Sequence, residues 1–445
     1  MNRLSSDDSK KRLIEESNRC VSCGLCLPHC PTYRLLQSEA DSPRGRIAMI
    51  NGVVTNRIPL NEKFIQHLDR CLTCRACESV CPNNVAYGRL VDEARSIIRA
   101  SAAASRKSGQ HPGKHQSRLF PALLTNWITQ PARLERLRGL LYLLQKSGTT
   151  RLFRKFNVWK NSLAGKILMQ LPPVVFPRTT FRKNRFFSST WQSFYPATGE
   201  EKGKVSLFLG CVARITDAET LNAAIFVLNR LGYSVCIPTE QTCCGALYQH
   251  AGEPEKAKQL MQRNMRAFSG LGVQAIITTA SGCSVQLKEF STDCITTDAY
   301  SAGPGMVQVI DISKFLMGVA DWDTIMIKPL AKTIAVHDPC SLRHVLHDQI
   351  HPYRLLTHIP DAQVVLLADN DQCCGAAGTY FIEQPALADK LLDGKIKVLD
   401  QSGAQLLVTS NIGCSMHIAS RLRAMDSGIE VLHPVTLLAR QMGMQ

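Results

Sequence analysis

The sequence predicts a multidomain protein in which an α-helical N-terminal domain precedes a duplicated α/β region with parallel sheets. Three observations support this fold class. Two cysteine runs with the same internal spacing lie within the first 100 of the 445 residues. From residue 204 onward, strand-like apolar segments alternate with helical segments, a pattern typical of parallel sheets covered by helices. The order of these segments recurs from about residue 331, which indicates an internal duplication.

Both cysteine runs follow the pattern C-x2-C-x2-C-x3-C-P, which holds four-iron four-sulfur clusters in bacterial ferredoxins. The first run contains Cys20, Cys23, Cys26 and Cys30, and the second contains Cys71, Cys74, Cys77 and Cys81. In two-cluster ferredoxins the fourth cysteine of each run serves the other cluster. We therefore expect one cluster on Cys20, Cys23, Cys26 and Cys81, and a second on Cys71, Cys74, Cys77 and Cys30. Two structural zinc sites are the alternative, although zinc normally draws separated C-x2-C pairs.

The segment between the two runs, residues 32–54, reads as helix, turn, helix. It predicts a helical ferredoxin-type domain over residues 1–100.

A second set of cysteines lies in the duplicated region. The first copy carries Cys211, Cys243, Cys244 and Cys283, spaced 32, 1 and 39 apart, and the second carries Cys340, Cys373, Cys374 and Cys414, spaced 33, 1 and 40 apart. Each cysteine follows a predicted strand, at the sheet edge where ligand sites form. We therefore expect two cysteine-rich domains, residues 201–330 and 331–445, each converging four sulfurs that are tentative ligands of a further iron–sulfur cluster.

The alternative is that these eight cysteines are buried thiols, because free cysteine behaves as a small apolar residue. Gly245 and Gly375, which follow the cysteine pairs, would allow the backbone to approach a bound group closely. Cys236 and Cys294 lie outside the repeat, and for them we favour a structural role.

The chain resembles the iron–sulfur subunits of glycolate oxidase, within a family that also serves anaerobic glycerol-3-phosphate dehydrogenase and heterodisulfide reductase. The resemblance rests on the cysteine motifs and on DSPRGRIAMI, TASGCSVQLKE, CCGAAGTY and SNIGCSMHIAS. It covers the chain except residues 101–200. It implies an electron-transfer subunit of a flavin-dependent glycolate dehydrogenase complex, with FAD and substrate oxidation in a partner subunit and a quinone or other membrane acceptor.

One departure concerns the last cysteine of each half. In the heterodisulfide reductase branch this cysteine belongs to a C-x-x-C pair, and five cysteines bind an unusual cluster. Here Gln286 and His417 stand at those positions, so five-cysteine ligation is in doubt. His417 could supply a nitrogen ligand, although a lone helical histidine is more often structural.

The sequence contains no motif for substrate oxidation. Oxidising a 2-hydroxy acid requires a flavin or nicotinamide, yet no G-x-G-x-x-G follows a strand, and G-x-S-x-G and H-E-x-x-H are also missing. We therefore expect no catalytic residues in this chain. Lactate or glycerol 3-phosphate are alternative substrates of the complex, and a cluster-bearing scaffold is the alternative of another class.

The net charge of +16 is concentrated in residues 101–190, which hold 17 Lys and Arg against one acid, Glu135. Residues 101–200 also include Trp127, Trp159 and Trp191. This segment is a basic linker that either lies on an anionic membrane, docks an acidic partner, or wraps the domains. Nucleic-acid binding is not expected, because it would leave the duplicated cysteines without a purpose.

The location follows from the N-terminal segment and from hydropathy. Residues 1–20 are polar and lack the apolar stretch of an export signal. No run reaches the roughly 18 to 20 apolar residues of a membrane span. We expect a cytoplasmic protein, peripheral on the cytoplasmic face of the inner membrane.

Overall fold

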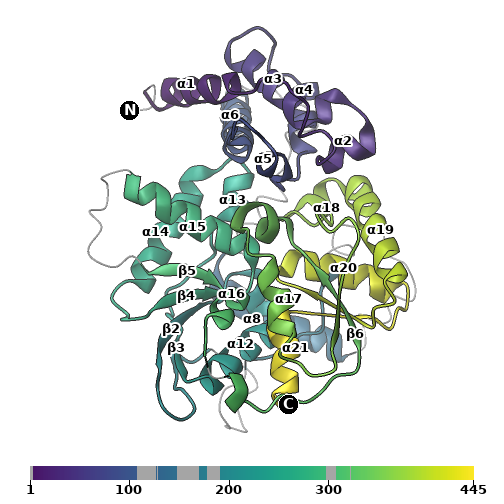
Figure 1. Cartoon of the computed structure of the whole chain (residues 1–445). Helices are drawn as coiled ribbons and strands as arrows, with labels where there is room; N and C mark the ends of the chain where they lie inside the picture. Colours follow the sequence, from purple (N-terminus) through teal and green to yellow (C-terminus); the bar gives the residue numbers. More distant parts are fainter. Residues whose placement is uncertain are drawn as a thin grey trace.

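The computed structural model describes residues 4–107, 127, 129–147, 170–177, 191–296, 307–320 and 322–444. A helical N-terminal module lies against two α/β halves that stand side by side (Figure 1). The predicted fold class is therefore confirmed. Within the described ranges, no helix combines the length and the apolarity needed to cross a membrane.

The N-terminal module is built from short helices. Ser42 and Asn61 cap the helices that follow them, by accepting hydrogen bonds from the amides of Gly45 (2.9 Å) and Phe64 (3.0 Å). The helices are α1 (Leu4–Asn18), α2 (Pro31–Leu36), η1 (Glu39–Asp41), α3 (Pro43–Val54), α4 (Glu62–Asp69), α5 (Ala76–Ser79) and α6 (Tyr87–Lys107). Their apolar faces form a separate small core, so the module holds its cysteine loops on a packed frame.

The first half contains a five-stranded sheet with the order β1-β3-β2-β4-β5. All neighbouring strands are parallel except the short edge strand β1, which pairs antiparallel with β3. The strands are β1 (Phe194–Tyr195), β2 (Gly203–Phe208), β3 (Tyr233–Cys236), β4 (Ala275–Thr278) and β5 (Gln308–Asp311). The helices are α11 (Val212–Thr216), α12 (Ala218–Arg230), α13 (Ala246–His250), α14 (Pro254–Phe268), α15 (Ser281–Thr296) and α16 (Ile312–Met317).

The second half contains a four-stranded parallel sheet with the order β7-β6-β8-β9. A short 3-10 turn, η3 (Trp322–Thr324), precedes it. The strands are β6 (Thr333–His337), β7 (Gln363–Leu366), β8 (Leu406–Thr409) and β9 (Glu430–Leu432). The helical segments are η4 (Leu342–Leu346), α17 (Ile350–Leu356), α18 (Tyr380–Glu383), α19 (Pro385–Gln401), α20 (Ile412–Ala424) and α21 (Pro434–Gln441).

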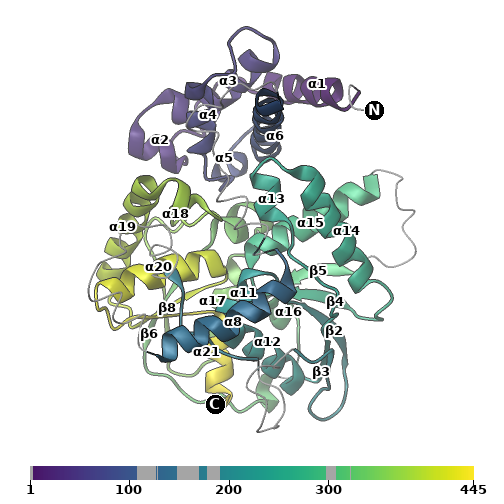
Figure 2. The same ribbon diagram turned by 180° about the vertical axis from the view of Figure 1, so that it is seen from behind.

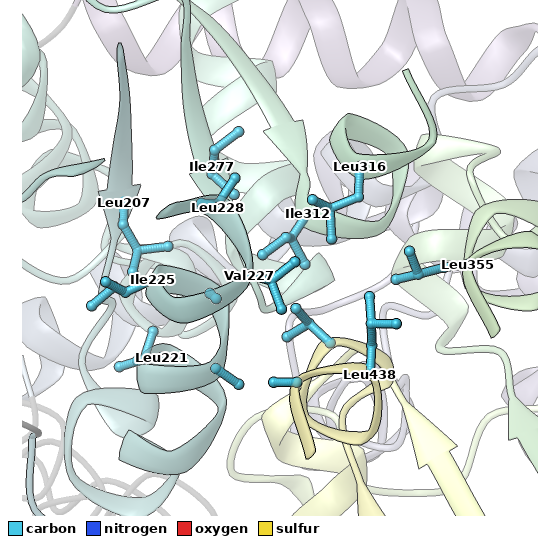
Figure 3. Packing of buried hydrophobic residues seen from close by; sticks show 14 of the residues in the cluster. Leu207, Leu221, Ile225, Val227, Leu228, Ile277, Ile312, Leu316, Leu355 and Leu438 are labelled. Atoms are coloured by element: carbon cyan, nitrogen blue, oxygen red, sulfur yellow. The ribbon is translucent and has the colours of Figure 1, made fainter. Parts of the chain in front are cut away.

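One apolar core joins the two halves. Figure 3 shows Val227 of α12 between Leu221 of the same helix and Leu438 of α21, with Leu355 of α17 next to Leu438. These side chains are fully buried, and each contributes about 1.5 to 3 kcal/mol by leaving water. The two halves therefore share one hydrophobic core and pack against each other directly.

Part of the basic linker is ordered against this pair. Helix α8 (Pro131–Lys146) lies on the back of the molecule (Figure 2), where Arg138 donates to the backbone oxygen of Arg214 (2.7 Å) and Leu141 is buried. Trp191 is buried in the shared core and Trp127 is exposed, while Trp159 lies outside the described residues.

Candidate metal centres

The first cysteine run forms a loop around a small cavity. Left-handed backbone at Ser22 (φ 56°) and Gly24 (φ 86°) turns this loop tightly. The cavity is lined by Cys20, Cys23 and Cys26 of the first run, by Cys81 and Cys77 of the second, and by Arg44, Ile47 and Tyr87. The structure thus places the fourth cysteine of the second run beside the first run.

The second cysteine run surrounds a neighbouring cavity in the same way. Its loop turns at Thr73 (φ 52°) and Arg75 (φ 60°), and the amide of Thr73 donates to Cys71 Sγ (3.4 Å). The cavity is lined by Cys71, Cys74 and Cys77, by Cys30 of the first run, and by Arg46 and Tyr87. Cys77 lines both cavities; apart from it, the first cavity meets three cysteines of the first run and the fourth of the second run. The second cavity meets three cysteines of the second run and the fourth of the first run.

The donor sets fit a cationic metal cluster. Burial raises the pKa of Cys26 to about 11 and raises the pKa of Cys74 and Cys77 well above that of an ordinary thiol. Such thiols become thiolates only beside strong positive charge, and coordinated iron supplies that charge. Leaving aside Cys77, which the first cavity shares with the second, four cysteines surround each cavity, which is the ligand number of a four-iron four-sulfur cluster.

The two cavities differ in their exposure. The loop of the first carries exposed Cys23, Val21 (65% exposed) and Leu25 (55%). At the second cavity, Cys30 and Cys71 are buried. The first cavity therefore lies at the surface of the module and the second lies inside the molecule.

A buried arginine side chain, Arg46, lines the second cavity. Arg46, only 1% exposed, donates to Thr32 Oγ1 (3.1 Å) and to the backbone oxygen of His67 (2.7 Å), and its guanidinium lies 3.5 Å from Asp41. Thr32 Oγ1 in turn lies 3.3 Å from Cys30 Sγ. Arg46 thus places a positive charge close to the thiolates of this cavity.

Replacing Arg46 with methionine should destabilise the module by about 1 to 3 kcal/mol, because the buried backbone oxygen of His67 loses its donor, while Asp41 keeps Arg70 and His67 as partners. It should also lower the reduction potential of a cluster in the second cavity, because a nearby positive charge favours the reduced state. Anaerobic urea unfolding and a redox titration measure both effects. The control is Arg44→Met, which removes a less buried arginine of the same helix and should change stability little. Equal stability of the two variants would contradict this role for Arg46.

In each cysteine-rich half, the four thiols form a connected chain. In the first half the free thiol of Cys243 is hydrogen-bonded to those of Cys211 and Cys244, and Cys244 is hydrogen-bonded to Cys283. The hydrogen bonds from Cys243 and Cys283 hold the pKa of Cys244 well below its ordinary value. The second half repeats this chain in the order Cys340, Cys373, Cys374 and Cys414. In each half the four sulfurs are therefore successive neighbours.

The glycines after the cysteine pairs serve the packing of each half. Gly245 and Gly375 have φ of +88° and +87°, where side chains are strained. A Cβ at Gly245 would lie 3.1 Å from the backbone of Ala257, and one at Gly375 would lie 2.7 Å from that of Ala388. The close approach that these glycines allow is therefore to α14 and α19.

The second cavity of the module adjoins the second half. Cys74 packs in one small apolar cluster with Cys340 and Cys373. Cys74 and Cys340 also line a third cavity where all three domains meet, with Gln286, His250 and Glu289. Arg95 ties the module to this junction, by donating to the backbone oxygens of Cys71 (2.7 Å) and His250 (3.2 Å). The sequence does not reveal this junction, because it depends on tertiary contacts between distant residues.

The sequence also singled out Cys236, Cys294 and His417. Cys236 lies in β3 opposite Phe194, and the side chain of Cys294 lies outside the described part of the chain. His417 Nδ1 lies 3.4 Å from Gln170 Nε2, and its ring centroid lies 5.8 Å from that of Phe381, with the two rings tilted by 35°.

Sequence reasoning missed His337. A ring nitrogen of His337 and the sulfurs of Cys374 and Cys414 all lie within 4.8 Å of one another. Burial lowers the pKa of His337 to about 3, so its ring is neutral. The available signal was its place in HDPC, three residues before Cys340.

Comparisons with known proteins agree with this arrangement. Residues 16–85 match the family model of the 4Fe-4S dicluster domain, and residues 205–288 and 334–419 match that of the cysteine-rich domain. The chain is 33% identical over 452 residues to the probable glycolate oxidase iron-sulfur subunit of Bacillus subtilis, covering 98% of this chain and 97% of that protein. It is 32% identical to the glycolate oxidase iron-sulfur subunit of Escherichia coli, covering 90% and 89%. Lactate utilization protein A of Geobacillus kaustophilus is 28% identical over 53% of this chain and 98% of its own length.

Proposed function

Because the chain belongs to the family of glycolate oxidase iron–sulfur subunits, we propose that it is the electron-transfer subunit of a glycolate dehydrogenase complex. In this complex a flavoprotein subunit oxidises glycolate to glyoxylate, and the electrons continue toward a quinone. The observation that carries the proposal is the pair of adjacent cavities, which share Cys77 and each of which brings together three cysteines of one run and the fourth of the other.

The proposed ligands follow from these cavities. One four-iron cluster would be held by Cys20, Cys23, Cys26 and Cys81, and the other by Cys71, Cys74, Cys77 and Cys30. When bound, each cluster accepts and releases one electron at a time, so two clusters divide the electron pair of a reduced flavin. We also propose that the domains of the chain meet at about residues 100, 200 and 330.

The cysteine-rich region offers a further donor set. The four connected sulfurs of the first half, Cys211, Cys243, Cys244 and Cys283, are the proposed ligands of a further iron–sulfur cluster. The second half offers Cys340, Cys373, Cys374 and Cys414, and there a histidine nitrogen joins the sulfurs.

The flavoprotein would dock on the face that carries the first cavity. Val21 and Leu25 are exposed on its loop although both are apolar, and Cys23 is exposed between them. A partner bound there would cover this apolar surface and come close to the first cavity. The second cavity is closed off by the second half, so it is not accessible to a partner in the same way.

The membrane contact would involve α8. Its buried side holds the helix to the protein, whereas Leu140 (55% exposed) and Leu143 (51%) remain exposed, near Arg133 and Lys146. Exposed leucines flanked by basic residues suit an anionic lipid surface. We therefore propose that the subunit is peripheral on the cytoplasmic face of the inner membrane.

The double variant Leu140→Ser, Leu143→Ser should bind anionic vesicles at least about tenfold more weakly, because each leucine contributes roughly 1.5 to 3 kcal/mol when buried. Cosedimentation with vesicles measures the binding. The control is Leu366→Ser, which removes a leucine that is 72% exposed on edge strand β7 of the second half. If the double variant binds vesicles like the parent but loses the flavoprotein, the segment docks a partner instead.

The substrate of the complex separates the leading proposal from its alternatives. The name of the Geobacillus relative points to lactate, but that relative matches only 53% of this chain. The complex should be purified anaerobically, and its visible cluster absorbance followed after adding glycolate, D-lactate or glycerol 3-phosphate. Rapid bleaching by glycolate supports the proposal, and bleaching by another substrate alone reassigns the complex. A complex with intact clusters that no substrate bleaches would indicate a scaffold.

A further inference from the structure

The second cysteine-rich half contains a buried group of donors that mixes sulfur and nitrogen. His337 ends β6, Cys374 follows β7, and Cys414 lies in the first turn of α20. Their donor atoms all lie within 4.8 Å of one another, and the three side chains are at most 5% exposed. They come from three different elements, so the fold itself brings them together.

The ring of His337 is oriented for ligation. Its Nδ1 lies 2.9 Å from Thr409 Oγ1, which faces it across the paired strands β6 and β8. Among the described residues, Nε2 of His337 is buried and has no hydrogen-bond partner. Metal-binding histidines typically donate one ring nitrogen to such a neighbour and present the other nitrogen to the metal. An unpartnered buried nitrogen is costly, and a metal ion would satisfy it.

The first half lacks this nitrogen at the same place. Phe208 pairs in register with Thr278 there, just as His337 pairs with Thr409. Phe208 also stands three residues before Cys211, as His337 stands three before Cys340. The two halves thus share their sulfurs but differ in one donor, which gives the second half its own coordination chemistry.

We propose that His337 Nε2, Cys374 and Cys414 bind a single Zn²⁺ ion, with Cys373 as the fourth ligand. Of the two remaining sulfurs of this half, Cys373 is hydrogen-bonded to Cys374, whereas Cys340 is hydrogen-bonded to Cys373. Nitrogen and thiolate donors in a closed, buried, four-coordinate set are typical of structural zinc. Zinc bonds of about 2.0 to 2.3 Å place tetrahedral ligands roughly 3.3 to 3.8 Å apart, so donors gathered this closely suit one ion. The nitrogen of His337 also distinguishes this half from the first, which has Phe208 at that place, and a mixed nitrogen and sulfur set suits zinc.

The surroundings balance the charge of such a site. Three thiolates and one Zn²⁺ carry a single negative charge, after three thiol protons pass to solvent on binding. Lys395 is buried and lies beside Cys373 and Cys374, where its ammonium group offsets that charge. The site is redox-inert and connects β6, β7 and α20, so its role is to hold the second half together beside the second cluster cavity.

Metal analysis of the full chain tests the proposal. The parent should contain about one zinc ion in addition to its iron, and zinc-edge X-ray absorption should show three sulfurs and one nitrogen. His337→Phe places the residue of the first half at this position and should retain zinc at least about tenfold more weakly against a chelator. His337→Cys should keep zinc with four sulfurs, and His417→Phe should keep it unchanged.

Iron content provides an independent readout. All variants should keep the iron of the N-terminal module, which shows that the chain is folded and separates this test from that of electron transfer. Equal zinc retention by the parent and His337→Phe would overturn the proposal. So would additional iron with acid-labile sulfide on the second half, or zinc without a nitrogen ligand in the parent.

Discussion

Replacing Cys74 with serine should lower the iron content from about eight to about four atoms per chain and stop glycolate-driven quinone reduction. Cys74 lines the second cavity together with Cys30, Cys71 and Cys77, so its loss removes one ligand from a set of four. The flavoprotein partner should still bind glycolate, because its site lies in another chain. Iron analysis and quinone-reduction assays on the complex measure the two effects.

The control for this prediction is Cys236→Ser. Cys236 is a half-buried thiol on β3, the strand that pairs with the edge strand β1, and it lines neither cavity. It should retain full iron and full activity. Quinone reduction at the parental rate by the Cys74 variant would contradict the role of the second cavity.

Replacing Cys81 with serine should remove the other cluster, although Cys81 belongs to the same run as Cys74. The reason is that Cys81 lines the first cavity with Cys20, Cys23 and Cys26. Double variants test whether the fourth cysteine of each run binds the cluster of the other run. Cys81→Ser with Cys23→Ser should keep about four irons, because both changes damage one cluster, whereas Cys81→Ser with Cys74→Ser should keep almost none.

The opposite pattern of iron contents in the two double variants would contradict this swapped assignment of Cys81 and Cys30. If each run held its own cluster, the Cys81 and Cys74 changes would damage a single cluster and leave about four irons. The Cys81 and Cys23 changes would then damage both clusters. Iron and acid-labile sulfide measured on the two double variants decide between these arrangements.

The sequence predicted those features that are local or periodic. Cysteine spacing identified the two runs, and alternating strands and helices identified both parallel sheets, including β2 and β6 at corresponding places. Spacing also predicted that Cys81 lies with the first run and Cys30 with the second. In the structure Cys81 lines the first cavity and Cys30 lines the second. These features are legible because each depends on a few neighbouring residues or on a repeated pattern.

Other features depend on packing between distant segments and could not be read from spacing. Cys74 lies beside Cys340 only because the module docks against the second half. His337 approaches Cys374 and Cys414 because parallel strands bring three separate loops to one sheet edge. His417 was the histidine considered from the sequence, but it lies on Phe381 and beside Gln170.

The most direct test of the central claim is the iron and acid-labile sulfide content of the anaerobically purified chain, with an electron paramagnetic resonance spectrum after reduction. Two cubanes in the N-terminal module predict about eight irons and eight sulfides, with signals from two reduced clusters. A content clearly above eight with matching sulfide would indicate a further cluster in one of the cysteine-rich halves. Four irons or fewer, or zinc in the two cavities, would contradict an electron-transfer role for this subunit.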